Sequence, residues 1–160
     1  MRVVIFGSTG LLGQSIKSYL GLSNYKCFGS SLKKNSDFKS DLQSDKEIIQ
    51  FLNKSKPNIV INCVSETNVD LCNANFKIAY RSNVLTIRNI VKALKKTNKK
   101  IHLIHISTDQ VYDSKFASEE TQTNISNIYG VTKFLGELET LNYKESLVLR
   151  TNFFGKSFSK

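Results

Sequence analysis

The pattern of apolar positions divides the chain into alternating strands and helices. Short apolar runs predict strands at 2–6, 25–28, 37–40, 58–62, 101–106 and 146–150, and the pattern is weakest at 37–40. Between these runs, apolar residues recur every three or four positions. This spacing predicts helices at 11–20, 45–53, 78–94 and 128–141.

The predicted strands are apolar throughout, which is typical of a parallel sheet covered by helices on both faces. We therefore expect an α/β fold, a Rossmann-type doubly wound parallel sheet flanked by helices. The chain has one proline and no linker-like or repeated segment, so we expect one domain over residues 1–160. Such a sheet binds ligands beyond the carboxyl ends of its strands.

Composition narrows the class of protein. The chain has 160 residues, 40% of them hydrophobic, which is enough for a core. No apolar run approaches the roughly 20 residues that cross a membrane, and the first residues do not form a signal peptide, so we expect a cytoplasmic protein without membrane contact. Three cysteines are an odd number, which argues against a disulfide framework. His102 and His105 would point to opposite faces of a strand, so we expect no metal site.

The formal net charge is +10, which raises the question of an anionic partner. The basic residues are mostly lysines spread along the chain, and the one dense group, at 92–100, closes a predicted helix, where cations favour the helix dipole. Basic and aromatic residues do not interleave as in a nucleic-acid-binding module. We therefore expect no nucleic-acid partner.

A glycine-rich turn joins the first predicted strand to the first predicted helix. Gly7, Gly10 and Gly13 have the spacing G-x-x-G-x-x-G in the position that a dinucleotide-binding turn occupies. A plain tight turn is the alternative, but the flanking strand and helix favour a dinucleotide, whose phosphates a helix N-terminus attracts.

The end of the second predicted strand bears on which dinucleotide is bound. Many NAD enzymes place an acid there to hold the ribose 2′-hydroxyl. Residues 29–34 hold no acid; they supply the hydroxyls of Ser30 and Ser31 and the side chains of Lys33 and Lys34, which suit a 2′-phosphate. NADP(H) is therefore favoured and NAD(H) is the alternative, because loop lysines are often merely solvated.

Candidate catalytic groups lie in the second half of the chain. Thr108 and Asp109 follow a predicted strand, so they lie on the ligand side of the sheet, where a hydroxyl can polarise a substrate carbonyl. Tyr129 and Lys133 are four apart on a predicted helix and share a face. A lysine ammonium near a tyrosine lowers the pKa of the phenol and makes it usable in proton transfer. An ordinary turn and a surface Tyr–Lys pair are the alternatives, but the order of all these motifs is more specific than any one of them.

Together these stretches resemble the extended short-chain dehydrogenase/reductase superfamily, and within it proteins of the dTDP-4-dehydrorhamnose reductase type. The stretches that carry the resemblance are residues 6–13, 57–63, 67–70, 105–112, 129–137 and 149–155. They occur in the family's order and reach from the first strand almost to the last residue.

The resemblance implies a role for each matching residue. Tyr129 would give a proton to the carbonyl oxygen, Lys133 would hold the nicotinamide ribose and lower the pKa of the tyrosine, and Thr108 would bond the reacting carbonyl. Asp109 would touch the substrate. Apart from Tyr129 and Lys133, the expected cofactor-binding residues are Gly7, Thr9, Gly10, Leu11, Leu12, Gly13, Ser30, Ser31, Asp41, Leu42, Cys63, Val64, Ser65 and Asn83.

Two departures from the family pattern stand out. Val64 is bulkier than the alanine common in the family, and Glu66 brings a negative charge near an anionic cofactor. The chain also ends at Lys160, so the C-terminal substrate-binding region of the family is expected to be largely absent. Apolar surface left uncovered there would favour self-association into a homo-oligomer.

Three functions therefore stay open. The first is an NADP(H)-dependent reductase of a nucleotide-activated 4-keto sugar, or its cofactor-binding portion. The second is an epimerase or dehydratase of nucleotide sugars that retains NAD. The third is a non-catalytic dinucleotide-binding or regulatory subunit.

Overall fold

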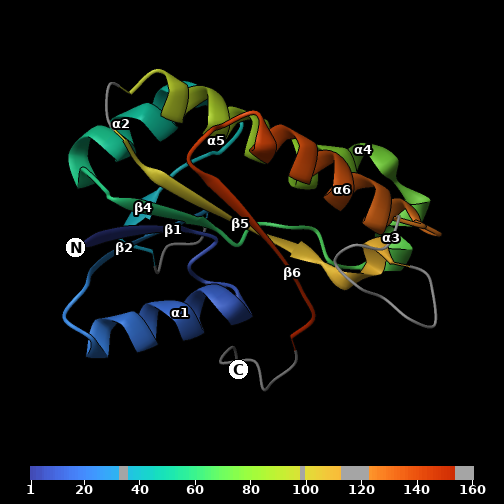
Figure 1. Cartoon of the computed structure of the whole chain (residues 1–160), viewed down its shortest axis with the longest axis horizontal. Helices are drawn as coiled ribbons and strands as arrows, with labels where there is room; N and C mark the ends of the chain where they lie inside the picture. Colours follow the sequence, from blue (N-terminus) through green and yellow to red (C-terminus); the bar gives the residue numbers. More distant parts are fainter. Residues whose placement is uncertain (33–35, 98–99, 113–122, 154–160) are drawn as a thin grey trace.

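Six parallel strands form one sheet through the middle of the molecule (Figure 1). A computed structural model of the chain describes residues 1–32, 36–97, 100–112 and 123–153. The strands lie in the order β3-β2-β1-β4-β5-β6, so the chain changes direction across the sheet between β1 and β4. This order confirms the predicted Rossmann-type sheet. The strands are β1 (Arg2–Phe6), β2 (Lys26–Ser31), β3 (Phe38–Lys39), β4 (Ile59–Asn62), β5 (His102–Thr108) and β6 (Ser146–Thr151).

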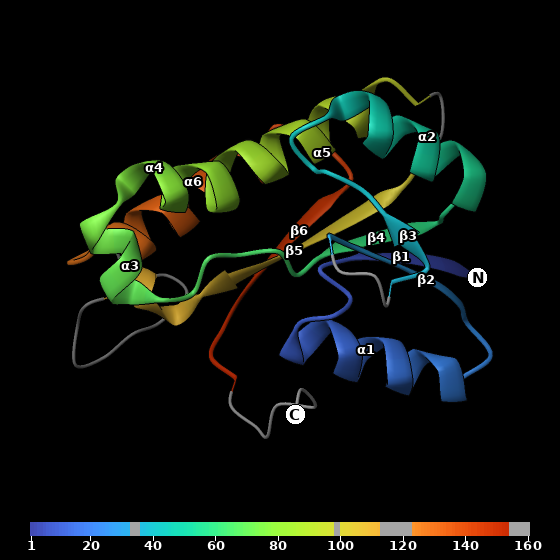
Figure 2. The same cartoon turned by 180° about the vertical axis from the view of Figure 1, so that it is seen from behind.

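Helices cover the two faces of the sheet unequally (Figures 1 and 2). The helix α1 (Leu11–Leu22) lies on one face, and α2 (Asp45–Ser55), α5 (Thr86–Lys95) and α6 (Ile128–Leu141) lie on the other. Two short helices, α3 (Val69–Ala74) and α4 (Phe76–Tyr80), contact α6 at the carboxyl end of the sheet. None of the described helices is long and apolar enough to cross a membrane.

Helix α2 shows how local sequence determines an element. Ser44 caps its N-terminus by accepting a hydrogen bond from the backbone N–H of Glu47. The helix ends where Lys56 adopts a left-handed conformation with φ 48°, directly before Pro57. The Phe51 ring on this helix stacks on that of Phe38, with 4.6 Å between the ring centroids. It also packs edge-to-face against the Phe6 ring, with 6.0 Å between the centroids, so α2 is joined to the core of the sheet.

The predicted helix at 78–94 is interrupted in the structure. It consists of α4, a π-helical turn η1 (Arg81–Leu85) and α5. The π-helical turn is a single interruption within an otherwise helical segment, and the spacing of apolar residues over 78–94 did not distinguish it from the α-helix on either side. The sequence prediction also lacked α3, which is only six residues long.

The sheet face on the side of α1 is open over β4, β5 and β6. Leu147 and Leu149 on β6 are 49% and 42% exposed. A hollow of about 410 Å³ lies next to them and is lined almost entirely by apolar residues. Its lining residues are Ser15, Ile16, Tyr19, Leu20, Ile61, Ile104, Ile106 and Leu149. The apolar surface that the sequence led us to expect is therefore present.

Candidate dinucleotide site and catalytic group

The glycine turn packs tightly against its neighbours. Gly7 has a positive φ of 79°, and its N–H donates to the carbonyl of Ser30 over 2.9 Å. A Cβ atom on Gly13 would lie 2.2 Å from the carbonyl oxygen of Gly7. Because no side chain fits in that space, the first turn of α1 lies directly on the turn that precedes it.

The N-terminus of α1 is suited to an anion. Gly10 is the N-cap residue, no side chain caps the helix there, and the first turn holds no acidic residue. The first N–H groups of a helix lack partners within the helix, so those of Leu11 and Leu12 are available to a phosphate.

A pocket of about 660 Å³ opens beside this turn, a size typical of ligand sites. Nine of the expected cofactor residues line it, namely Gly7, Thr9, Gly10, Ser31, Asp41, Leu42, Cys63, Val64 and Ser65. Leu11, Leu12, Gly13, Ser30, Asn83, Thr108, Asp109, Tyr129 and Lys133 are not in the lining. The structure therefore gathers residues from the first four strand ends around one cavity at the switch point of the sheet.

The two serines expected at a 2′-phosphate differ in position. The Ser30 hydroxyl is buried and shares a hydrogen bond of 2.5 Å with the Ser40 hydroxyl. The Ser30 carbonyl accepts a hydrogen bond from the Gly7 N–H, so Ser30 supports the wall of the pocket. Ser31 lines the pocket itself. Lys33 and Lys34 lie outside the described residues.

An acid near β2 is engaged elsewhere. The Asp37 carboxylate accepts hydrogen bonds from the Gly29 N–H and from Lys17 Nζ, both over 2.6 Å. Burial opposes ionisation of this carboxyl, but these two partners outweigh it and lower its pKa. Asp37 does not line the pocket, so it does not take the place of the ribose-binding acid.

Tyr129 lies in the first turn of α6, buried at the edge of the site. Asn127 caps the helix by accepting from the Gly130 N–H over 2.7 Å, which orients this turn. The side chains of Thr108 and Ser65 lie near the Tyr129 hydroxyl, where they favour its ionised form. The fold therefore brings hydroxyls from three elements together, at the ends of β4 and β5 and on α6.

Burial raises the pKa of Tyr129, and the side chains of Thr108 and Ser65 offset this in part. Lys133 is buried on the same helix face, but its Nζ donates to the carbonyl of Ile106 over 2.6 Å. The expectation that Lys133 lowers the pKa of Tyr129 is therefore wrong for this arrangement. The ammonium turns toward β5, and burial of the phenol is the larger effect.

The pKa of Lys133 is itself lowered to about 8, because burial disfavours its charged form. Glu137 and Cys63 act in the opposite direction. Burial also raises the pKa of the Cys63 thiol to about 12. Since Cys63 is neutral near pH 7, the negative charge that favours the Lys133 ammonium comes from Glu137.

Asn83 links the pocket wall to α6 from within the π-helical turn. Its side-chain oxygen accepts from the Ser65 hydroxyl over 3.0 Å and from the Glu66 N–H over 2.8 Å. Its amide donates to the Thr132 hydroxyl over 3.0 Å. Asn83 thus holds Ser65, one of the two partners of Tyr129, and acts through it.

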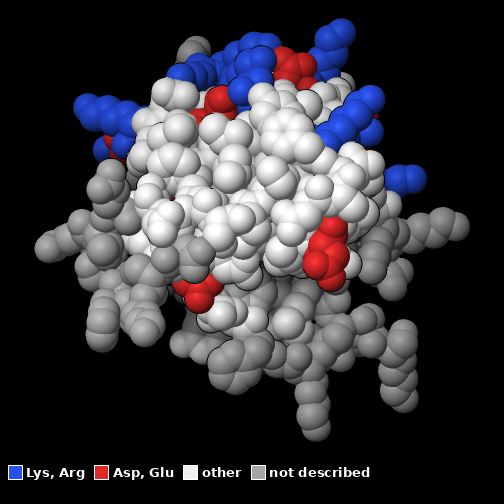
Figure 3. All heavy atoms as spheres, turned by 90° about the vertical axis from the view of Figure 1, so that its right-hand side faces the viewer, with Lys and Arg blue, Asp and Glu red and all other residues white. Residues whose placement is uncertain are grey.

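Charge is sparse at the carboxyl end of the sheet. In Figure 3, which views the right-hand side of Figure 1, uncharged surface fills the middle of the face and Lys and Arg gather along its upper rim. The net charge of the chain is therefore not concentrated over the centre of this face. Among the described residues, no three His, Cys, Asp or Glu side chains gather as metal ligands.

Comparison with known protein families places this chain in a family. The family model described as the RmlD substrate binding domain matches residues 1–157. The chain belongs to the RmlD substrate binding domain family.

Relatives of this RmlD-family chain include enzymes and a subunit. It is 31% identical to the dTDP-4-dehydrorhamnose reductase of Aggregatibacter actinomycetemcomitans, over 99% of this chain and 55% of the relative. It is 30% identical to methionine adenosyltransferase 2 subunit beta of Rattus norvegicus, over 93% of this chain and 46% of the relative. The crystal structure of the Bacillus anthracis dTDP-4-dehydrorhamnose reductase in complex with NADP superposes with a TM-score of 0.82 at 26% identity, over 93% of this chain and 52% of that one. The RmlD-family chain therefore spans about half the length of the relatives it matches.

Several site residues were not found by sequence reasoning. Gln43, Arg81 and Thr86 also line the pocket, and the Gln43 amide donates to the Thr86 hydroxyl over 3.1 Å. His105 is buried beneath the site and pairs with Asn62 over 3.0 Å. Burial and the nearby Lys133 lower the pKa of His105 well below its usual value, so it is neutral. Because Asn62 and His105 are polar residues within otherwise apolar strands, the sequence could have indicated that they pair with each other inside the protein.

Proposed function

We propose that this RmlD-family chain binds NADP(H) and forms the cofactor-binding and catalytic portion of a reductase acting on a nucleotide-activated 4-keto sugar. One observation carries the proposal. The Tyr129 hydroxyl lies near the side chains of Thr108 and Ser65 at the carboxyl end of the sheet, and Ser65 also lines a pocket that begins at a glycine-rich turn. The names of the relatives support a substrate of the dTDP-4-dehydrorhamnose type.

The residues fit a dinucleotide. A Cβ atom on Gly13 would collide with the turn, and the uncapped N-terminus of α1 offers N–H groups in a first turn that holds no acid. Asp41 and Leu42 line the part of the pocket expected to border an adenine, and Ser31 lies where a 2′-phosphate would be held. When bound, NADPH supplies the hydride. NAD(H) is the alternative cofactor.

The side chains around Tyr129 account for the proton that reduction of a carbonyl requires. The raised pKa of Tyr129 keeps the phenol protonated at neutral pH, so it is a proton donor in its resting state. Thr108 bonds the same carbonyl oxygen and orients it, and Asp109 follows at the substrate side. Lys133, protonated below about pH 8, holds the nicotinamide ribose.

Turnover tests this proposal. The chain is joined to the C-terminal region of the Aggregatibacter relative, and NADPH oxidation is followed with a dTDP-4-keto sugar. We expect turnover that falls by at least about 100-fold in Tyr129→Phe, because the proton donor is lost. A chimera that binds NADPH but shows no turnover would overturn the reductase proposal.

A regulatory subunit is the second candidate, favoured by the likeness to methionine adenosyltransferase 2 subunit beta. It shares the dinucleotide pocket but does not use Tyr129 as a proton donor. This candidate predicts NADPH binding without turnover, and a biological function that survives Tyr129→Phe.

A further inference from the structure

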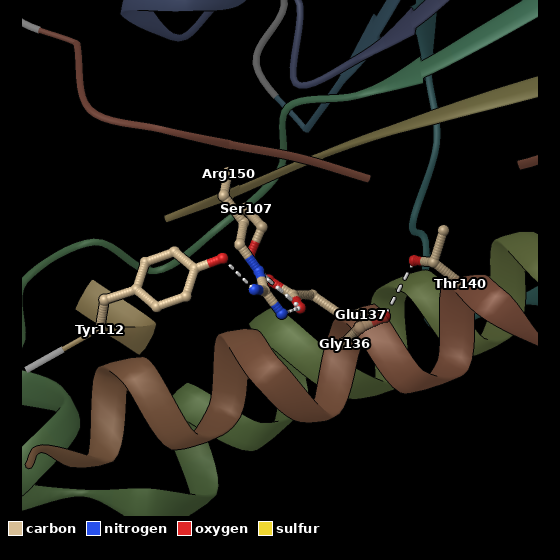
Figure 4. A network of polar contacts seen from close by, with 6 residues as sticks. All are labelled: Ser107, Tyr112, Gly136, Glu137, Thr140 and Arg150. Atoms are coloured by element: carbon tan, nitrogen blue, oxygen red, sulfur yellow. Dashed lines mark hydrogen bonds and ion pairs between the residues drawn. The ribbon is translucent and has the colours of Figure 1, made fainter. Parts of the chain in front are cut away.

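A partly buried ion pair joins Arg150 to Glu137, which lies one helical turn beyond Lys133 on α6. Figure 4 shows this pair with Ser107 and Tyr112. The Glu137 side chain is 3% exposed and meets Arg150 Nη2 over 2.6 Å. Arg150 Nε lies 3.0 Å from Glu137 Oε1, so the contact is bidentate. The Ser107 hydroxyl donates to the same Oε1 over 2.5 Å. The carboxylate is therefore fully bonded inside the protein.

The partners of Glu137 come from the strands that bear the site. Ser107 on β5 directly precedes Thr108, and it pairs in register with Arg150 on β6. Arg150 also donates to the Tyr112 hydroxyl and lies over its ring at 4.9 Å from the centroid. Tyr112 follows η2 (Asp109–Val111), so contacts from the pair reach both sides of the segment 108–109.

Stability alone does not account for this pair. Taking the Glu137 charge out of water costs several kcal/mol, and the partly exposed Arg150 less, while apolar residues of similar volume are often as stable. Removing one partner is expensive because the other charge is left buried. A bidentate contact does fix the distance and angle between the elements that carry it.

We propose that Glu137 and Arg150 form a positioning element of the reductase site, holding residues 107–109 at the end of β5 against the face of α6 that carries Tyr129 and Lys133. The inference rests on the proposed function, since it assigns the pair to that site. It has an electrostatic consequence. The titratable groups near Lys133 are Glu137 on its own helix, His105 on β5 and Cys63 after β4, and of these Glu137 does most to favour the Lys133 ammonium.

Three variants of the whole chain separate the effect of the Glu137 charge from an effect on folding. Glu137→Gln removes the charge and keeps an oxygen for the Ser107 hydroxyl. Glu139→Gln is the matched control, because Glu139 is on the same helix as Glu137 and its ion pair with Arg88 on α5 is broken. The Glu139 side chain is 23% exposed. The double variant Glu137→Leu/Arg150→Met replaces the pair with apolar volume and preserves folding.

The first readout is the Lys133 side chain itself, titrated by carbon NMR at its Cε. We expect a pKa of about 8 in the wild type and in Glu139→Gln. Glu137→Gln should lower it by about one unit, the size of shift that loss of one nearby opposite charge produces. The second readout is the NADPH dissociation constant. We expect it to rise at least about 10-fold in the double variant, because Lys133 and Thr108 lose their fixed geometry.

Each result decides the matter. A double variant that folds and binds NADPH as tightly as the wild type, or a Lys133 pKa that Glu137→Gln does not move, would overturn the positioning role. If the wild type does not bind NADPH, the proposed function fails. The Lys133 titration then still shows separately whether Glu137 acts on this side chain.

Discussion

Gly13→Ala tests the packing on which the dinucleotide turn depends. A Cβ atom at this position would lie 2.2 Å from the Gly7 carbonyl oxygen, and 2.9 Å from both the Gly7 carbonyl carbon and Ser8 Cα. All three are backbone atoms, so no side chain can rotate away. Helix α1 must move by about 1 Å to restore an ordinary contact, which weakens the packing of Ile16 and Leu20 on the sheet.

The expected loss follows from that collision. Overpacking of this kind costs roughly 1–3 kcal/mol and occasionally more, and alanine in a helix recovers up to about 1 kcal/mol relative to glycine. Because three backbone atoms are involved, we take a collision cost of about 3 kcal/mol, and we expect Gly13→Ala to lower the free energy of unfolding by about 2 kcal/mol after that gain. Gly21→Ala on the same helix is the matched control, since nothing lies within 4 Å of its Cβ position. It should raise stability by about 0.5–1 kcal/mol.

Urea denaturation followed by circular dichroism measures both variants. The two free energies of unfolding should differ by about 3 kcal/mol, the cost of the collision, because the helix preference of alanine is common to both variants. If Gly13→Ala is as stable as Gly21→Ala, the close approach of α1 to the turn is not as the structure has it, and the argument for the phosphate site loses its basis.

Three further predictions concern the buried polar groups and the open sheet face. The pKa of Lys133 falls from 10.5 to about 8 on folding, so the unfolded chain binds more protons than the folded chain between these pH values. The free energy of unfolding of the wild type, measured relative to that of Lys133→Met, should therefore rise by about 3 kcal/mol as pH increases from 8 to 10.5. A difference between the two proteins that does not change with pH would contradict this. Asn83→Ala should cost about 2–3 kcal/mol in urea denaturation, because Thr132 and Ser65 lose a buried partner, and a cost below about 0.5 kcal/mol would show that these bonds are unimportant. The exposed Leu147 and Leu149 should cause concentration-dependent self-association in sedimentation velocity, which Leu149→Glu reduces; a wild type that stays monomeric throughout would refute it.

Elements with a strong local pattern were predictable from the sequence. The apolar runs at β1, β4 and β5 and the glycine turn before α1 carry their information in adjacent residues, and the parallel sheet with its switch between β1 and β4 confirms the expected fold. The shared helix face of Tyr129 and Lys133 also followed from their spacing.

Features that depend on distant parts of the chain were not predictable. The direction of the Lys133 ammonium is decided by the Ile106 carbonyl, 27 residues away on β5. Glu137 on a helix looks like an ordinary solvated charge until the fold places Arg150 and Ser107 around it. Burial, which sets the pKa of both Tyr129 and Lys133, is likewise a property of the assembled fold.

Binding of NADPH tests the central claim most directly. The nucleotide's fluorescence is titrated with the wild-type chain and with Gly10→Ala. A Cβ atom on Gly10 would lie at an ordinary 3.4 Å from the Gly7 carbonyl oxygen, and Gly10 lines the pocket. The account predicts saturable binding by the wild type and binding at least about 10-fold weaker in Gly10→Ala, with stability little changed. A folded wild-type chain that shows no saturable binding, or equal binding by both proteins, would contradict it.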